Sequence, residues 1–244
     1  MTSHAHIQLF SLALWASSNA AFAACTAESA TSRQHLVELY TSEGCDSCPP
    51  AERWMSALRK HDDLVGLEFH VDYWDNSEWR DPFSDHAYTV RQQEIARRGN
   101  RDQTYTPQIW LDGRVWVNWP KGAPPAVSEA SAVRMTLAGS AADPLNFAVK
   151  VEGDSQPSYR LYAALTQNGL EEHIRGGENR GKTLKHDQVV RGLSGPFALT
   201  QTHLAVAAPA RFDLENGALV AFVQDEADGN IVQLVKLPLK ECTK

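Results

Sequence analysis

Cys45 and Cys48 are separated by two residues and are followed directly by two prolines, in the segment EGCDSCPP. Thiols at this spacing can close a disulfide, resolve a mixed disulfide or supply two soft ligands to a metal. A metal site would need further ligands, because the pair supplies only two. The pair itself leaves three alternatives open: a redox dithiol, a structural disulfide and half of a metal site.

The start of the chain has the pattern of an export signal. The first 23 residues contain no Asp, Glu, Lys or Arg, and a short apolar run among them leads to Ala21-Phe22-Ala23. This is typical of a signal peptide with an A-x-A cleavage site, although the usual basic residues are missing. The run is too short to span a bilayer, for which about 20 residues are needed. We expect a signal peptide at 1–23, no transmembrane span, and a periplasmic or secreted protein. Lipidation of Cys25 is the alternative, because Phe22-Ala23-Ala24-Cys25 approaches a bacterial lipoprotein box.

Two further cysteines, Cys25 and Cys242, lie near the ends of the exported chain. An even number of cysteines in an exported protein indicates disulfides, and four cysteines allow three pairings. Cys45 and Cys48 are near neighbours, whereas the termini of a domain often lie close together in space. The sequence therefore predicts a Cys45–Cys48 disulfide and a structural Cys25–Cys242 disulfide.

Composition limits the partners of the protein. The chain has 244 residues, of which 43% are hydrophobic and 22% charged, and its net charge is -7. This length permits one large or two modest domains, each with its own core. Surfaces that bind nucleic acid concentrate Lys and Arg to displace counterions from phosphates, so we expect no nucleic-acid partner.

The segments around the two thiols alternate between strand and helix patterns. An apolar, β-branched run at 35–41 predicts a strand that leads into the cysteines. Apolar side chains at helical spacing predict a helix over 51–60, and 64–71 is the next strand. Backbone N–H groups and the dipole at a helix N-terminus favour a thiolate there. By position, Cys45 is the attacking thiol and Cys48 the resolving one.

Two features oppose the activation of Cys45. Pro49 and Pro50 lack N–H groups and fit only the first helical turn, so the helix is expected to start at or just after Cys48. Glu43 and Asp46 add negative charge, which raises the pKa of a nearby thiol. The sequence thus predicts a redox-capable pair with a weakly activated nucleophile.

Further elements follow the second strand. An acidic, aromatic loop at 72–85 precedes a helix over 86–98, which Ser84 or Asp85 could cap. Thr106-Pro107 then enters a strand that turns at Asp112-Gly113, a strong hairpin signal, and a last helix is expected over 125–137. Short strand-like runs beyond residue 141 predict a small antiparallel sandwich.

The order strand, C-x-x-C, helix, strand, helix and Thr-Pro resembles the thioredoxin-like fold. That resemblance implies that Pro107 is cis and that Thr106 and Pro107 lie beside Cys45, where they would hold a substrate chain. A closer resemblance is to an exported bacterial family, domain of unknown function 1223. It rests on VELYTSEGCDSCPPAE, HVDYWD, RQQ, YTPQIWLDGR and GENRGKTLKHDQVVR. The expected fold is an α/β thioredoxin-like domain at 33–140 followed by a small antiparallel β-sandwich-like domain at 141–244.

Two polar residues on the expected strands are candidates for the site. Glu38 lies in an otherwise apolar strand, and a buried carboxylate under the dithiol could shuttle the proton of the resolving thiol, as in thioredoxin-like oxidoreductases. The alternative is a carboxylate on the polar side of the strand. His70 could join the cysteines as a third ligand, as in copper-delivery proteins of thioredoxin-like fold. A packed or hydrogen-bonded histidine at a strand end is the alternative.

The loop after the second strand could bind a ligand. Exposed aromatic residues are typical of recognition surfaces, and ordinary loop packing is the alternative. The candidates are Asp72, Tyr73, Trp74, Asp75 and Trp79. A second polar group could be a site or a hydrogen-bond network between domains, and it comprises Glu178, Asn179, Arg180, His186, Asp187 and Arg191.

The sequence therefore predicts an exported thiol-disulfide oxidoreductase that acts on cysteine-containing proteins or peptides. That chemistry needs no cofactor. The alternative is a metal (copper) or polypeptide binding protein in which the disulfide is structural.

Overall fold

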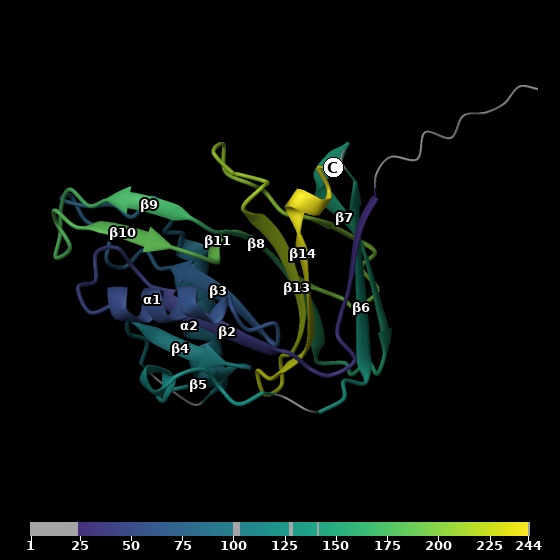
Figure 1. Ribbon diagram of the computed structural model, residues 1–244. Helices are drawn as coiled ribbons and strands as arrows, with labels where there is room; N and C mark the ends of the chain where they lie inside the picture. Colours follow the sequence, from purple (N-terminus) through teal and green to yellow (C-terminus); the bar gives the residue numbers. More distant parts are fainter. Residues whose placement is uncertain (1–23, 100–102, 127–128, 141, 244) are drawn as a thin grey trace, which may run out of the picture.

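A computed structural model of the protein describes residues 24–99, 103–126, 129–140 and 142–243 (Figure 1). The expected signal peptide at 1–23 lies outside these residues, and so does residue 141, where the predicted domain boundary falls. Of the described residues, 42% lie in strands and 14% in helices. The protein is thus mostly β.

The largest sheet has eight strands. They are β2 (His35–Thr41), β3 (Leu64–His70), β4 (Gln108–Leu111), β5 (Arg114–Val115), β8 (Tyr159–Gln167), β11 (Val189–Phe197), β13 (Gly217–Asp225) and β14 (Ile231–Pro238). Their order across the sheet is β14-β13-β8-β11-β3-β2-β4-β5. Strand β11 joins the two halves, because it pairs antiparallel with β8 and, where Val189 lies opposite Glu68, parallel with β3.

A second sheet has four antiparallel strands, β1 (Ala24–Glu28), β6 (Val133–Ser140), β7 (Asp143–Gly153) and β12 (His203–Ala205). Val133, Met135 and Leu137 of β6 share one hydrophobic core with Leu161 of β8 and Leu219 of β13. Figure 1 shows β6 and β7 beyond β13 and β14, on the side away from the helices. A separate hairpin comprises β9 (Leu170–His173) and β10 (Thr183–His186).

Two α-helices occur within the described residues, α1 (Pro49–Leu58) and α2 (His86–Arg98). Side chains of a strand alternate between the faces of a sheet, so β2 can bury residues on both sides. Its Val37 and Leu39 belong to the hydrophobic cluster that includes residues of α1, whereas Leu36 and Tyr40 belong to the cluster that includes residues of α2. Short 3-10 turns lie at Trp119–Lys121 (η1) and Leu239–Glu241 (η2).

Several local predictions are confirmed. Helix α1 begins at Pro49, directly after Cys48, and its two prolines occupy the first two helical positions. Helix α2 covers His86–Arg98, and the side chain of Asp85 caps it by accepting a hydrogen bond from the backbone of Ala87. The hairpin of β4 and β5 turns at Asp112 and Gly113, which both have positive φ.

Both predicted disulfides form, Cys45–Cys48 and Cys25–Cys242. A sulfur of Cys25 that is bonded to Cys242 is not free to carry a lipid, so the structure favours the disulfide over the lipoprotein alternative. No helix of the described ranges is long and apolar enough to cross a membrane. These features are compatible with an exported protein, and export itself stays a prediction.

The expected fold class, an α/β thioredoxin-like domain followed by a small β-sandwich-like domain, is wrong. The chain is mostly β, and its two described helices accompany large multi-stranded sheets. Strands β8, β11, β13 and β14, which we expected in a separate sandwich, continue the sheet that β2 and β3 begin. An unpaired strand edge exposes backbone N–H and C=O groups, and β11 pairs with the edge of β3 where Val189 lies opposite Glu68.

The helix expected over 125–137 is also wrong, because residues 133–140 form strand β6. Val133, Met135 and Leu137 point into the core, whereas Arg134 between them is exposed. This alternation has the period of a strand facing a core on one side.

His35 gives the stability of the fold a pH dependence. Its Nδ1 lies 2.5 Å from Oδ2 of Asp112, and its Nε2 lies 2.8 Å from the carbonyl of Pro125. Burial opposes the charged imidazole, but the hydrogen bond and charge of Asp112 outweigh it and raise the pKa of His35. Because the pKa of His35 is higher in the folded protein than in the unfolded chain, protonation of His35 stabilises the fold. This stabilisation is complete below the unfolded-state pKa of about 6.5 and is lost as pH rises through the folded-state pKa.

We therefore expect the difference in unfolding free energy between the wild type and His35→Gln to be largest below about pH 6.5 and to shrink above it. Urea unfolding between about pH 5.5 and 9 measures this difference. His61→Gln, at an exposed histidine, is the control. A difference that stays constant across the range would contradict the assignment.

Candidate functional site

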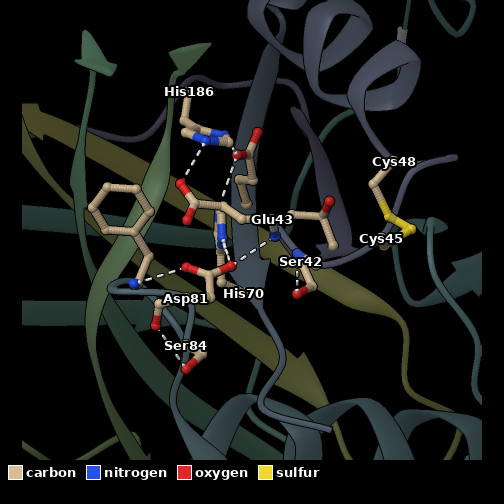
Figure 2. Close-up of polar contacts among 12 residues, drawn as sticks. Ser42, Glu43, Cys45, Cys48, His70, Asp81, Ser84 and His186 are labelled. Atoms are coloured by element: carbon tan, nitrogen blue, oxygen red, sulfur yellow. Dashed lines mark hydrogen bonds and ion pairs between the residues drawn. A yellow bond between two sulfur atoms is a disulfide. The ribbon is translucent and has the colours of Figure 1, made fainter. Parts of the chain in front are cut away.

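The Cys45–Cys48 disulfide lies at the start of α1, beside a group of buried polar side chains (Figure 2). The carbonyl of Cys48 accepts a hydrogen bond from the backbone N–H of Ala51 at 2.9 Å. Cys45 is 1% exposed and Cys48 is 0% exposed, whereas Asp46 and Ser47 between them are exposed. The tip of the loop therefore faces solvent while both cysteines are covered.

The turn between β9 and β10 holds the cysteine loop. The side-chain amide of Asn179 donates to the carbonyl oxygens of Glu43 and Cys45, at 2.8 and 2.9 Å. A carboxylate oxygen of Glu178 accepts from the backbone N–H of Asp46 at 3.1 Å. Two of the polar residues that we considered in the second half, Glu178 and Asn179, thus bond to the cysteine loop.

Trp74 links the cysteine loop to Thr106. A Cβ atom placed on Gly44 would lie 3.2 Å from Cβ of Trp74, and the indole N–H of Trp74 donates to the hydroxyl of Thr106 at 2.7 Å. The Thr106–Pro107 peptide bond is cis, as the resemblance implied. Tyr73 is 44% exposed, and its hydroxyl donates to Gln92.

The two candidate aspartates of this loop form local hydrogen bonds. Oδ1 of Asp72 accepts from the hydroxyl of Thr89, and its Oδ2 lies 2.9 Å from Nδ1 of His86. Burial raises the pKa of Asp72, but these contacts outweigh it and lower that pKa. Oδ2 of Asp75 accepts from the hydroxyl of Ser84 at 2.7 Å. Both carboxylates shape the loop, and their role in binding a ligand stays a prediction.

Six buried acidic and imidazole side chains lie next to the cysteine loop, and we call them the acid–histidine cluster. They are Glu43, Glu52, Glu68, His70, Asp81 and His186. They come from the loop after β2, from α1, from β3, from the loop before α2 and from β10. None is more than 2% exposed, so the cluster is shielded from solvent.

Glu68 lies at the centre of the cluster. Its Oε1 is 3.1 Å from Nε2 of His70 and 3.1 Å from Nδ1 of His186. The opposite nitrogens face other carboxylates, since Nδ1 of His70 is 2.7 Å from Asp81 and Nε2 of His186 is 3.3 Å from Glu43. Glu52 is 3.7 Å from Nδ1 of His186. Each imidazole is therefore held between carboxylates.

Proton affinities in the cluster depart from their ordinary values. Burial opposes a charge on either histidine, but the carboxylates raise the pKa of His70 well above its ordinary value and that of His186 to about 10. Burial raises the pKa of Glu52 to about 7. Burial also works against the charge of Glu68 and Asp81, but the histidines lower both of their pKa values.

Glu38 lies on the opposite face of β2 from α1. Its carboxylate forms a two-point ion pair with Arg91 of α2, at 2.6 and 3.1 Å, and accepts a hydrogen bond from the hydroxyl of Tyr40. Val37 and Leu39, which flank it in the strand, face the core of α1. The predicted role of Glu38 as a proton shuttle stays a prediction, and these contacts favour a structural ion pair.

The contacts of His70 are with carboxylates and not with Cys45 or Cys48. Both of its ring nitrogens face carboxylates, those of Asp81 and Glu68, and both cysteines are in a disulfide. The contacts therefore favour the alternative of a hydrogen-bonded histidine at a strand end over a copper ligand shared with the thiols.

Our candidate residues omitted several members of the cluster. Glu68 and His70 alternate in β3, so they lie on the same face of an otherwise apolar strand, and this spacing was a usable signal. Glu52 lies four residues after Cys48 and therefore on the same side of α1. Asp81 lies in an aperiodic loop, so no spacing rule pointed to it.

The architecture defines a class of protein, namely a disulfide-bonded, mostly β protein with a disulfide at the start of its first helix and a buried acid–histidine cluster beside it. The sequence model described as "Protein of unknown function (DUF1223)" matches residues 36–224. The chain belongs to this family, which confirms the second resemblance.

Two solved structures share the fold. A crystal structure of a protein from Agrobacterium tumefaciens has a TM-score of 0.61 and 22% identity, over 84% of this chain and 94% of that one. The structure of HBP35 of Porphyromonas gingivalis has a TM-score of 0.58 and 12% identity, over 86% of this chain and 76% of that one. No curated protein matches the sequence significantly. At these identities the likeness concerns the fold alone.

Proposed function

We propose that the protein is an exported thiol-disulfide oxidoreductase that acts on cysteine-containing proteins or peptides through Cys45 and Cys48. The observation that carries the proposal is a disulfide at the start of α1, separate from the disulfide that joins the chain ends. On the chain-entropy model so small a ring stabilises by only about 2 kcal/mol, against about 5 kcal/mol for the Cys25–Cys242 loop. The terminal disulfide is therefore the main staple, and opening the Cys45–Cys48 ring costs the fold less stability.

The exchange balances without a cofactor. A substrate thiolate attacks Sγ of Cys45, the Cys45–Cys48 bond breaks, and its electron pair leaves on Sγ of Cys48. A second substrate thiolate attacks the substrate sulfur of the mixed disulfide and releases Cys45 as a thiolate. The substrate becomes a disulfide and loses two electrons, which the protein gains as a dithiol. The reverse sequence reduces a substrate disulfide.

The surface beside the disulfide suits an extended polypeptide. A hollow lined by Gly44, Trp74, Glu78 and Glu178 adjoins the cysteine loop. Tyr73 and Tyr105, which are 44% and 47% exposed, both bond to Gln92 near Thr106. Because Cys45 is covered, a substrate must displace part of this surface before it reaches the sulfur.

A redox titration tests the proposal. We expect Cys45–Cys48 to be reduced at a potential above about −300 mV while Cys25–Cys242 stays oxidised, as measured by alkylation and mass spectrometry. Insulin reduction should be lost in Cys45→Ser, and Cys48→Ser should accumulate mixed disulfides at Cys45. Cys25→Ala/Cys242→Ala, assayed below its melting temperature, is the matched control and should keep activity. If the two disulfides are reduced together, the proposal fails.

A polypeptide-binding protein with an inert disulfide is the second candidate, and the burial of both cysteines favours it. In that case Cys45→Ala/Cys48→Ala would bind an unfolded peptide as tightly as the wild type, whereas Trp74→Ala would bind it more weakly. Fluorescence polarisation with a cysteine-free peptide separates the two functions, because such a peptide cannot exchange disulfides.

A further inference from the structure

The acid–histidine cluster has a donor arrangement that the proposed exchange chemistry does not use. Nε2 of His70 and Nδ1 of His186 both point to Oε1 of Glu68, each at 3.1 Å. These three donor atoms all lie within 4.8 Å of one another. Ligands of a four-coordinate zinc ion, at about 2.0–2.2 Å from the metal, lie about 3.3 Å apart. The two separations from Oε1 of Glu68, each 3.1 Å, are thus close to the spacing that such an ion requires.

The far nitrogens of both imidazoles are held in the manner of metal-binding histidines. Nδ1 of His70 faces Asp81 at 2.7 Å, and Nε2 of His186 faces Glu43 at 3.3 Å. Histidines that bind metals generally donate their second N–H to a carboxylate or carbonyl, which fixes the ring and its tautomer. The remaining nitrogens, Nε2 of His70 and Nδ1 of His186, therefore both face Oε1 of Glu68.

The carboxyl groups of the cluster outnumber its imidazoles, and one carboxylate oxygen lacks a partner in the described part of the chain. The cluster contains four carboxyl groups and two imidazoles, all buried. Glu68 is fully buried, and within the described residues its Oε2 has no hydrogen-bond partner. An unpaired carboxylate oxygen in the interior is costly, and buried charges are generally paired or coordinate metals.

We propose that Glu68, His70 and His186 bind one divalent transition-metal ion of the zinc type. Two imidazole nitrogens and one carboxylate oxygen suit such an ion better than calcium or magnesium, which prefer oxygen ligands. Glu52, 3.7 Å from Nδ1 of His186, is the carboxylate placed to approach the fourth position. The cysteines are not ligands in this site.

The metal would tie together segments that are distant in the sequence. It would join β3 to β10, and through Glu43 it would reach the residue two positions before Cys45. Because metal binding to a folded site contributes to folding, the ion would stabilise the hairpin that holds the cysteine loop. This inference is independent of the proposed exchange function, since it needs neither a dithiol nor a substrate.

Metal analysis of the exported, oxidised protein tests the inference first. We expect about one zinc per chain as isolated from zinc-supplemented cells, and one zinc per chain again after removal with EDTA and refolding with zinc. His70→Gln and His186→Gln should each bind zinc more than about 100-fold more weakly, and Asp81→Asn about 10–100-fold more weakly. The control is His173→Gln, an exposed histidine of the same hairpin, which should bind like the wild type. No zinc in either preparation, or unchanged binding in both cluster variants, would overturn the site.

Cobalt substitution of the wild-type protein gives a readout that does not depend on folding of the variants. We expect the visible absorption of a four-coordinate site with nitrogen and oxygen ligands, and no thiolate charge-transfer band. A thiolate band would instead place the metal on the reduced cysteines, and a spectrum of hexahydrated cobalt would mean that no site exists. Either result would refute the proposed ligands while leaving the redox titration of Cys45–Cys48 unaffected.

Discussion

Arg91→Met is expected to lower the free energy of unfolding by about 3–5 kcal/mol, because it leaves the carboxylate of Glu38 buried without its cation. Both side chains are buried, and their ion pair has distances of 2.6 and 3.1 Å. The pKa of Arg91 is raised above its ordinary value by the charge of Glu38, despite burial, so the guanidinium stays charged. Removing one partner of such a pair costs far more than the pair contributes.

The aromatic side chains around Arg91 cannot replace its positive charge beside Glu38. The guanidinium carbon lies 5.1 Å from the ring centre of Tyr162 and 5.2 Å from that of Phe222. These aromatic side chains belong to β8 and β13, so Arg91 connects α2 to the part of the sheet beyond β11. The tyrosine hydroxyl of Tyr40 can still donate to Glu38, but one neutral hydrogen bond does not balance a buried charge.

Urea unfolding at pH 7 with intact disulfides measures the loss in Arg91→Met. The matched control is Glu38→Gln/Arg91→Met, which should recover part of the stability, because the neutral amide leaves no uncompensated charge. A loss below about 1 kcal/mol, or a double variant no more stable than Arg91→Met, would show that the ion pair is not what holds α2 against β2.

Features set by local chemistry could be predicted from the sequence. The start of α1 follows from the missing N–H groups of Pro49 and Pro50, and the cap of α2 follows from Asp85. The β4–β5 turn follows from Asp112-Gly113, which tolerates positive φ. Each of these depends on a few consecutive residues, so no knowledge of distant neighbours was needed.

Features set by distant partners could not be predicted. The single register point between Val189 and Glu68 joins the two halves of the main sheet. Alternation of side chains can identify β11 as a strand, but it does not say which edge the strand will pair with. The expected fold class was wrong for this reason. The prediction for the segment that forms β6 was wrong for a different reason, because its alternating pattern was visible but was interpreted as helical.

The candidate site likewise combines a feature that local sequence predicts with contacts that depend on distant partners. The cysteine pairing could be derived from the spacing of Cys45 and Cys48 and from the usual closeness of domain termini, and the structure confirms it. Contact of His186 with Glu68 and Glu43 depends on β10 lying beside α1, which the sequence pattern does not reveal. Glu43 was noted only as a charge near Cys45. In the structure its backbone bonds to Asp81 and its side chain to His186, so it connects the cysteine loop to the cluster.

Cys25→Ala/Cys242→Ala is expected to lower the free energy of unfolding by up to about 5 kcal/mol, because the bond closes a loop with a sequence separation of 217 residues. Cys25 and Cys242 also lie in the core between the two sheets, so the loss includes packing there. The matched comparison is Cys45→Ala/Cys48→Ala, whose ring is so small that about 2 kcal/mol is expected.

Thermal unfolding monitored by circular dichroism, with each variant at the same protein concentration, ranks the two disulfides. The terminal variant should melt at the lower temperature, and below that temperature it should exchange disulfides at the wild-type rate. The opposite ranking would make Cys45–Cys48 the principal staple. Such a bond would be unsuited to repeated reduction during exchange, so that ranking would favour polypeptide binding with an inert disulfide over the oxidoreductase.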